Sequence, residues 1–118
     1  MLFATLLPTS AAGIVAGQTT GVAKKTSIYS VRVLDEMGSG TIATLVDGIN
    51  FVANSNLTNR IASMSLGGGK ADALNDAVEA AVKAGVLVIV AAGNEATDAC
   101  EISPGEALCN SCSCGGFC

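Results

Sequence analysis

The apolar run at residues 86–93 is the most marked pattern in the chain, and it ends abruptly at Gly93 and Asn94. No residue in this run carries a polar side chain, and β-branched residues are frequent at its start. The run is too short to cross a membrane and predicts a strand that is buried on both faces. Because ligands bind beyond the carboxyl ends of strands in open α/β sheets, we expect Asn94 to lie at a functional edge.

Two earlier segments also have strand patterns. Residues 27–34 are rich in β-branched and aromatic residues that partly alternate with polar ones. Residues 61–66 form a second short apolar segment, which ends at the glycines of positions 67–69. The sequence therefore predicts three strands.

Two segments with helical spacing lie between these strands. Apolar residues recur on one face from residue 42 to about residue 53, and the hydroxyl of Thr41 is placed to cap this helix. A second helix is predicted over residues 74–85, with Asp72 as its cap and Gly85 just beyond its last turn.

The resulting order is strand, helix, strand, helix, strand. Two right-handed crossovers in a parallel sheet satisfy this order, so the predicted fold is an α/β, doubly wound parallel sheet in one small domain. A polar loop at residues 54–59 separates the first helix from the second strand. It contains a glycosylation sequon at Asn56, which matters only if the protein is secreted.

The apolar first segment, residues 1–12, is ambiguous. It resembles a signal peptide in its small residues at Ser10 and Ala12, but no Lys or Arg precedes Lys24. This pattern favours a buried helix or a domain edge over a signal peptide. The main domain is then expected to cover residues 13–104.

The last segment, residues 105–118, has a different character because it holds four of the five cysteines. The first interpretation is a tail unrelated to the rest of the domain; the second is a set of disulfides that leaves Cys100 as the odd cysteine. Four thiolates on a metal ion rank third, because the spacing does not form two separated pairs. The cysteines of this segment are Cys109, Cys112, Cys114 and Cys118.

Composition narrows the classes of function. Hydrophobic residues make up 50% of the chain but aromatic residues only 3%, so the core must consist of aliphatic side chains packed against glycine. The net charge of −4 disfavours a nucleic-acid partner. The 118 residues include no histidine, which excludes a catalytic or metal-binding histidine from this chain.

Four motifs together resemble the subtilisin-like serine proteases, and most closely the proteinase K branch. They occur in the order and spacing of that family, and the resemblance runs from about Thr9 to Pro104. The motifs are GVAKKT at residues 21–26, VRVLD at 31–35 followed by GSG at 38–40, SMSLGGG at 63–69, and VAAGN at 90–94.

The resemblance implies a secreted endopeptidase that cleaves peptide bonds with a Ser-His-Asp triad. Asn94 matches the asparagine whose side-chain amide donates to the oxyanion of the tetrahedral intermediate. In subtilisin, loss of that donor costs about 10²–10³ in rate. Two segments match those that hold the substrate backbone by main-chain hydrogen bonds, so the implied partner is a peptide or protein. They consist of Gly38, Ser39 and Gly40 on one side and of Ser65, Leu66 and Gly67 on the other.

The sequence also departs from the family pattern. Leu7 falls where the catalytic histidine belongs, although Thr9, Ala12 and Gly13 match the same motif. The segments that bear the catalytic aspartate and serine are expected before Met1 and beyond Pro104. No metal or cofactor site is assigned, because the calcium ligands of the family cannot be placed.

We therefore expect a partial subtilisin-like domain that does not hydrolyse peptides by itself. Ser65 is interpreted as a serine at a strand end, since no histidine is present to activate it. Asp35 fits a strand end better than a catalytic acid. The alternative function is a non-catalytic pseudoprotease that binds a peptide or a partner chain.

Overall fold

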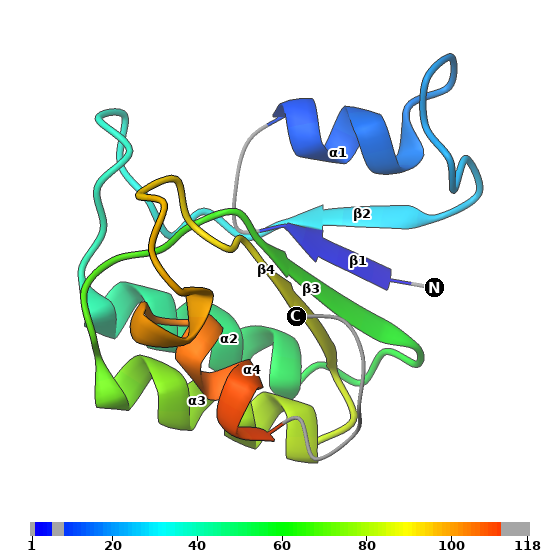
Figure 1. The fold of residues 1–118 in the computed structure, drawn as a ribbon. Helices are drawn as coiled ribbons and strands as arrows, with labels where there is room; N and C mark the ends of the chain where they lie inside the picture. Colours follow the sequence, from blue (N-terminus) through cyan, green and yellow to red (C-terminus); the bar gives the residue numbers. More distant parts are fainter. Residues whose placement is uncertain (1, 6–8, 112–118) are drawn as a thin grey trace.

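The computed structural model describes residues 2–5 and 9–111 of the chain. It contains one four-stranded sheet, and all three strand pairings are parallel (Figure 1). The strands lie in the order β2-β1-β3-β4. They are β1 (Leu2–Thr5), β2 (Ser27–Ser30), β3 (Arg60–Met64) and β4 (Leu87–Val90).

The helices lie on both faces of this sheet. Figure 1 shows α1 (Thr9–Ala16) on one side, and α2 (Ile42–Ala53) and α3 (Asp72–Lys83) on the other. A 3-10 helix η1 (Ala99–Glu101) and helix α4 (Gly105–Ser111) follow β4 and lie beside α3. The predicted α/β, doubly wound parallel sheet is confirmed, as is its central βαβαβ order.

Residues 2–5 form an interior strand, β1, which pairs with β2 on one side and β3 on the other. The helix expected over residues 1–12 is therefore wrong for residues 2–5, whereas residues 9–12 lie in α1. The main-chain groups of β1 pair with parallel strands on both sides. A run of this length does not distinguish a strand from a helix by periodicity alone.

The two long helices begin and end close to their predicted bounds. Thr41 caps α2 as predicted, since its hydroxyl oxygen accepts a hydrogen bond from the Thr44 amide at 3.2 Å. Asp72 is the first residue of α3 and not its cap; the cap position is Ala71, without a side-chain hydrogen bond. Gly85 follows α3 with a φ of +82°, a conformation that glycine adopts without strain.

The hydrophobic core lies between the sheet and the layer of α2 and α3, and among residues 10–109 no aromatic side chain is one of its buried members. Its largest fully buried apolar side chains are Met64 and Val78. The core residues are Val33, Leu45, Ile49, Val52, Ala62, Met64, Leu74, Ala77, Val78, Ala81, Val86, Val88 and Ala107. Among the described residues, no helix is long and apolar enough to cross a membrane.

β4 is buried on one face only, which corrects the expectation drawn from its continuous apolar run. Val86 and Val88 face the core and are 3% and 8% exposed, whereas Leu87 and Ile89 are 58% and 48% exposed. The cause is that α3 covers one face of this edge strand, while no described helix covers the other.

This asymmetry gives a stability prediction. Val88→Ala removes buried methyl groups and should lower the free energy of unfolding by about 1–3 kcal/mol. Leu87→Ala removes a larger side chain from an exposed site and should cost less than about 1 kcal/mol. Urea unfolding of the two variants beside the parent chain measures both values. Equal losses would mean that both faces of β4 are buried in solution.

Candidate functional site

The carboxyl ends of β3 and β4 open into two neighbouring hollows. The chain leaves β3 at Ser65 and β4 at Ala91, and the Ala91 amide donates to the Met64 carbonyl at 3.1 Å. This bond holds the two strand ends together. Both segments therefore turn away from the sheet at the same edge, where α/β folds bind ligands.

The first hollow, called here the Asn94 hollow, has a volume of about 320 Å³. Its walls come from the segment after β3, from the turn after β4, and from Ile102. The lining residues are Ser65, Leu66, Gly67, Gly68, Gly69, Ala91, Gly93, Asn94, Glu95 and Ile102.

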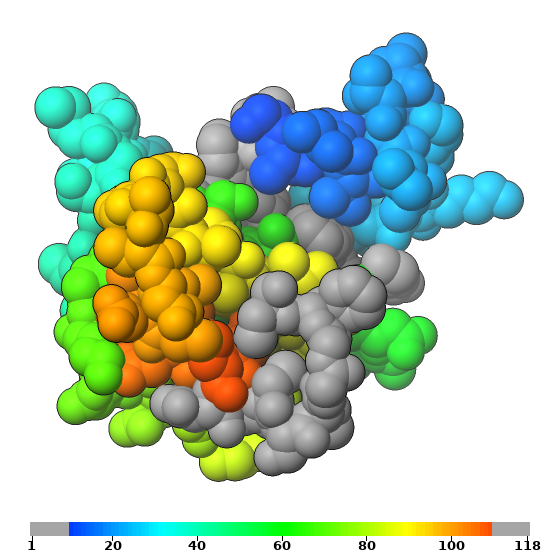
Figure 2. Space-filling view, viewed as in Figure 1, coloured from blue at the N-terminus to red at the C-terminus, as the bar shows by residue number. Residues whose placement is uncertain are grey.

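The second hollow, called the glycine groove, has a volume of about 520 Å³ and shares residues 65–69 with the first. On its other side it is lined by the loop before α2, which projects from the surface in Figure 2. The remaining lining residues are Leu34, Gly38, Ser39, Gly40, Ile42, Leu45, Leu74 and Ser103.

The structure thus brings together every site residue named from the sequence except Leu7, which lies outside the described residues. Gly38, Ser39 and Gly40 line the glycine groove opposite Ser65, Leu66 and Gly67. Asn94 lines the adjoining hollow with the same three residues of the second segment. The proximity of the three segments is a finding, and their roles are taken up as proposals below.

The loop of residues 35–40 is held by its own hydrogen bonds. The Asp35 carboxylate accepts from the amides of Met37 at 2.9 Å and Ser39 at 2.8 Å. Gly38 has a φ of +76°, which favours glycine. Asp35 therefore lies in this loop, beyond the end of β2 at Ser30, and not at a strand end as expected.

The turn after β4 requires Gly93. Its φ is +93°, and a β-carbon built on it would lie 2.6 Å from Ile102 Cδ1 and 2.7 Å from Glu95 Oε2. The Glu95 carboxylate also accepts a hydrogen bond from the backbone amide of Asn94 at 2.7 Å. Asn94 is consequently presented on an exposed turn whose backbone is held by the next side chain.

Ser103 holds the glycine segment after β3 (residues 67–69) through two hydrogen bonds. Its carbonyl accepts from the Gly68 amide at 3.1 Å, and its hydroxyl oxygen accepts from the Ala71 amide at 2.9 Å. Ser103 is 1% exposed and precedes a cis peptide bond to Pro104. The sequence indicated only a turn here, because nothing local signals a contact with residues more than thirty positions away.

A cluster of three polar side chains joins the end of the glycine segment to α3 and α4. Lys70 pairs with Glu106 at 2.6 Å, and the Asn75 side-chain amide donates to Glu106 at 2.9 Å. Asn75 is 9% exposed, and its Oδ1 has no partner in the described part of the chain. The sequence analysis missed this cluster, because its members are separated by five to more than thirty residues.

The ion pair shifts the pKa of both groups. The hydrogen bond from Lys70 lowers the pKa of Glu106 below its usual 4.5, against the opposing effect of burial, and Asn75 adds to the lowering. The same bond and the charge of Glu106 raise the pKa of Lys70 above 10.5. Both groups are therefore charged across the neutral range, and the pair stabilises the fold there.

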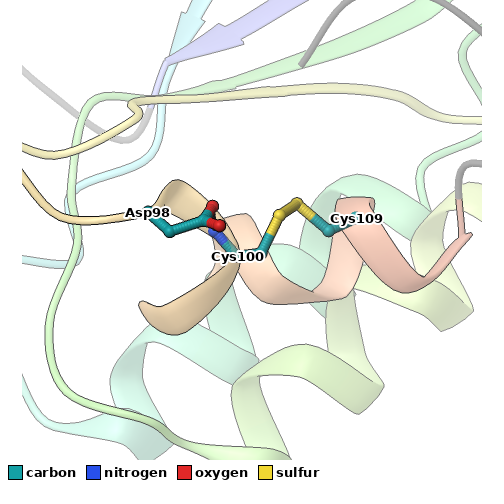
Figure 3. Close-up of a disulfide and its surroundings, with 3 residues drawn as sticks. All are labelled: Asp98, Cys100 and Cys109. Carbon is teal, nitrogen blue, oxygen red and sulfur yellow. Dashed lines mark hydrogen bonds between the residues drawn. A yellow bond between two sulfur atoms is a disulfide. The ribbon is translucent and has the colours of Figure 1, made fainter.

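Cys100 and Cys109 form a disulfide that links η1 to α4, with their Cα atoms 5.7 Å apart (Figure 3). The Asp98 carboxylate accepts from the Cys100 amide at 3.0 Å in the same place. The expectation that Cys100 would be the odd cysteine is therefore wrong, and Cys109 is not available as a metal thiolate. Cys112, Cys114 and Cys118 lie outside the described residues.

No group of three potential metal ligands occurs among residues 2–5 and 9–111. The polar groups of the two hollows are main-chain amides and carbonyls, the hydroxyls of Ser39, Ser65 and Ser103, one asparagine amide and one carboxylate.

Comparisons with known proteins agree with this architecture. The sequence profile of the Subtilase family matches residues 9–116. The chain is 50% identical over 100 residues to a cuticle-degrading serine protease of Arthrobotrys oligospora, and 46% identical over 96 residues to an extracellular serine proteinase of a Thermus species. The first match covers 84% of this chain and 24% of the relative, and the second 81% and 23%.

The structure also resembles the crystal structure of a cold-adapted subtilisin-like serine proteinase, with a TM-score of 0.79 and 44% identity. That match covers 81% of this chain and 35% of the other. The chain belongs to the Subtilase family. It spans about a quarter of the length of the curated relatives it matches.

The Glu106 contact gives a pH prediction. A carboxyl whose pKa is lowered by folding stabilises the fold above its unfolded pKa, and this contribution is lost as the pH falls through the folded value. The parent chain should therefore lose stability from pH 4.5 downward. Glu106→Gln keeps an oxygen acceptor for Asn75 and should be less stable at neutral pH, with a weaker acid dependence.

Urea unfolding at a series of pH values measures this difference. The matched control is Glu79→Gln, which removes an exposed pair with Lys83 on α3 and should cost no more than about 0.5 kcal/mol. If the parent and the Glu106→Gln variant lose stability in parallel below pH 4.5, the ion pair does not contribute to the fold.

Proposed function

We propose that this chain forms the peptide-holding and oxyanion-stabilising part of a subtilisin-like serine endopeptidase. The observation that carries the proposal is the meeting of three separate segments at one edge of the sheet. Residues 38–40 and 65–67 face each other across the glycine groove, and Asn94 stands at the adjoining hollow.

The groove suits the backbone of an extended peptide. Glycines at positions 38, 40 and 67 let a second chain approach the main chain closely, and the main chain offers both donors and acceptors. A peptide between the two segments would be held as an added strand, with affinity from main-chain hydrogen bonds. This role is proposed for Gly38, Ser39 and Gly40 and for Ser65, Leu66 and Gly67.

Asn94 is the proposed oxyanion donor. Its side-chain amide is neutral and lies beyond the end of β4, on a turn with a positive φ at Gly93 and a hydrogen bond from the Asn94 backbone amide to Glu95. A preorganised N–H donor lowers the barrier of acyl transfer by stabilising charge that develops on the carbonyl oxygen. It requires no proton transfer of its own.

The 118 residues by themselves are proposed to bind peptides without cleaving them. A Ser-His-Asp triad needs a histidine as general base, and these residues include none. The same observation supports the second candidate function, a non-catalytic peptide-binding protein. Action outside the cell is proposed from the Thermus relative, named extracellular, and from the Cys100–Cys109 disulfide.

Peptide binding and catalysis are tested separately on the 118-residue chain. A titration with an alanine-rich tetrapeptide, followed by amide NMR shifts, should perturb residues 38–40 and 65–67. The matched control is the same peptide with methylated backbone nitrogens, which lacks the main-chain donors and should bind about fivefold more weakly or worse. Absence of binding, or equal binding of both peptides, would contradict the groove proposal.

Catalysis is measured with a fluorogenic peptide and a serine-directed covalent probe. We expect neither turnover nor labelling by the 118-residue chain. Labelling of any serine above the background of heat-unfolded protein would overturn the proposal that these residues do not cleave peptides.

A further inference from the structure

The disulfide between Cys100 and Cys109 closes residues 100–109 into a loop, called here the disulfide ring (Figure 3). Its two cysteines are nine positions apart and half-buried, so a small thiol in solution has access to them. Pro104 and Ala107, inside the ring, are fully buried. The ring is therefore held in its middle by packing and at its ends by one covalent bond.

The disulfide ring holds the chain that leads from the glycine segment into α3. Ser103 accepts hydrogen bonds from the amides of Gly68 at 3.1 Å and Ala71 at 2.9 Å. Glu106 forms its ion pair with Lys70 at 2.6 Å. All three contacts start from inside the ring, so the position of this part of the chain depends on the position of the ring.

The disulfide ring also supplies one wall residue to each hollow. Ile102 lines the Asn94 hollow, and Ser103 lines the glycine groove. Residues 67–69, which the ring supports, line both hollows. A displacement of the ring would therefore alter both hollows together.

Without its disulfide the ring would be held much less firmly. Helix α4 has seven residues, and so short a helix is not stable by itself in water. A disulfide that closes a loop of this length favours the closed form by about 10²-fold, because it removes freedom from the open chain. The burial of Pro104 and Ala107 persists after reduction, so we expect a local opening with the rest of the fold intact.

We propose that the Cys100–Cys109 disulfide is a redox-sensitive clamp on the peptide groove. In the oxidised chain, the ring holds residues 68–71 in place for peptide binding. Reduction opens the ring, loosens these residues and weakens binding. The effect on peptides rests on the proposed function, whereas the clamping of residues 68–71 does not. Since disulfides persist outside the cell and are reduced in the cytosol, the chain would bind peptides where it is proposed to act.

The switching reaction is thiol–disulfide exchange with a small thiol such as glutathione. A glutathione thiolate attacks one cysteine sulfur, the S–S bond breaks, and the other sulfur leaves as a thiolate. A second glutathione thiolate attacks the mixed disulfide and releases the first cysteine. The protein gains two electrons and two protons, and two glutathione molecules become one glutathione disulfide.

The clamp is tested without any peptide by amide hydrogen exchange of the 118-residue chain, oxidised and in excess reduced glutathione. We expect the amides of Gly68 and Ala71 to exchange about 10- to 100-fold faster after reduction. Local opening exposes little surface, so this exchange should depend only weakly on added urea. The amides of Ile49 and Val52 in the core of α2 exchange through global unfolding and should depend on urea steeply.

These urea dependences separate a clamp from a general stabilising bond. If Gly68 and Ala71 exchange in the reduced chain with the same steep urea dependence as Ile49 and Val52, the disulfide acts on the whole fold. That result would overturn the inference. Unchanged exchange at Gly68 and Ala71 would overturn it too.

The effect on binding is measured by titrating both redox forms with the alanine-rich tetrapeptide. We expect the Kd of the reduced chain to be higher by about threefold or more, because only the closed fraction binds. Equal affinity of the two forms would refute the clamp and leave the groove proposal standing. Absence of binding by both forms would refute the groove proposal, and the exchange of Gly68 and Ala71 would still decide the clamp.

Two variants assign the response to this pair of cysteines. The double variant Cys100→Ser, Cys109→Ser should bind like the reduced parent and should not respond to glutathione. The matched control Cys112→Ser, Cys114→Ser, Cys118→Ser keeps the pair and should respond like the parent. Loss of the response in this control would overturn the inference. The comparison of the two forms of the parent needs no variant, so it remains decisive if the double variant does not fold.

Discussion

The right-handed crossover of parallel strands is the constraint on which the arrangement of this chain depends. The chain runs from β1 through α1 to β2, and then returns past β1 to place β3 on its other side. With one hand for all crossovers, a reversal of direction along the sheet puts α1 on the face opposite α2 and α3. The carboxyl ends of the strands beside this reversal lie at an open edge of the sheet, and the candidate site is found there.

The two hollows at this edge are built mainly from backbone. Glycines line both of them, and Ser103 holds the glycine segment through two hydrogen bonds with Gly68 and Ala71. A surface of this kind recognises an extended chain by its main-chain groups and leaves specificity to a few side chains. Here Asn94 and Glu95 stand next to each other on one turn, and the second holds the backbone of the first.

Much of this arrangement was predictable from local patterns. The local patterns predicted the positions of the strands β2, β3 and β4 and of the helices α2 and α3, and the Thr41 cap was confirmed. β1 was missed, because a short apolar run reads equally well as strand or helix. The burial of β4 was overestimated, because continuous apolar sequence does not show how many faces of a strand the neighbouring helices cover.

The sequence by itself determined the α/β class, the central strand and helix order, and the identity of the residues expected at the site. These follow from periodicity, turn chemistry and four ordered motifs, all of which are local along the chain. Only the tertiary structure decided that residues 38–40, 65–67 and 94 share one edge, that Ser103 supports the glycine segment, and that Cys100 pairs with Cys109. The site and Ser103 contacts join segments that lie far apart in the sequence, and the packing of the sheet and its helices brings them together. The disulfide joins residues only nine positions apart, but five cysteines allow several pairings, and the fold selects among them. Val86 to Asn94 shows both parts: its pattern predicted the strand and the turn, and the fold supplied the hollow beside Asn94 and the carboxylate of Glu95 within it.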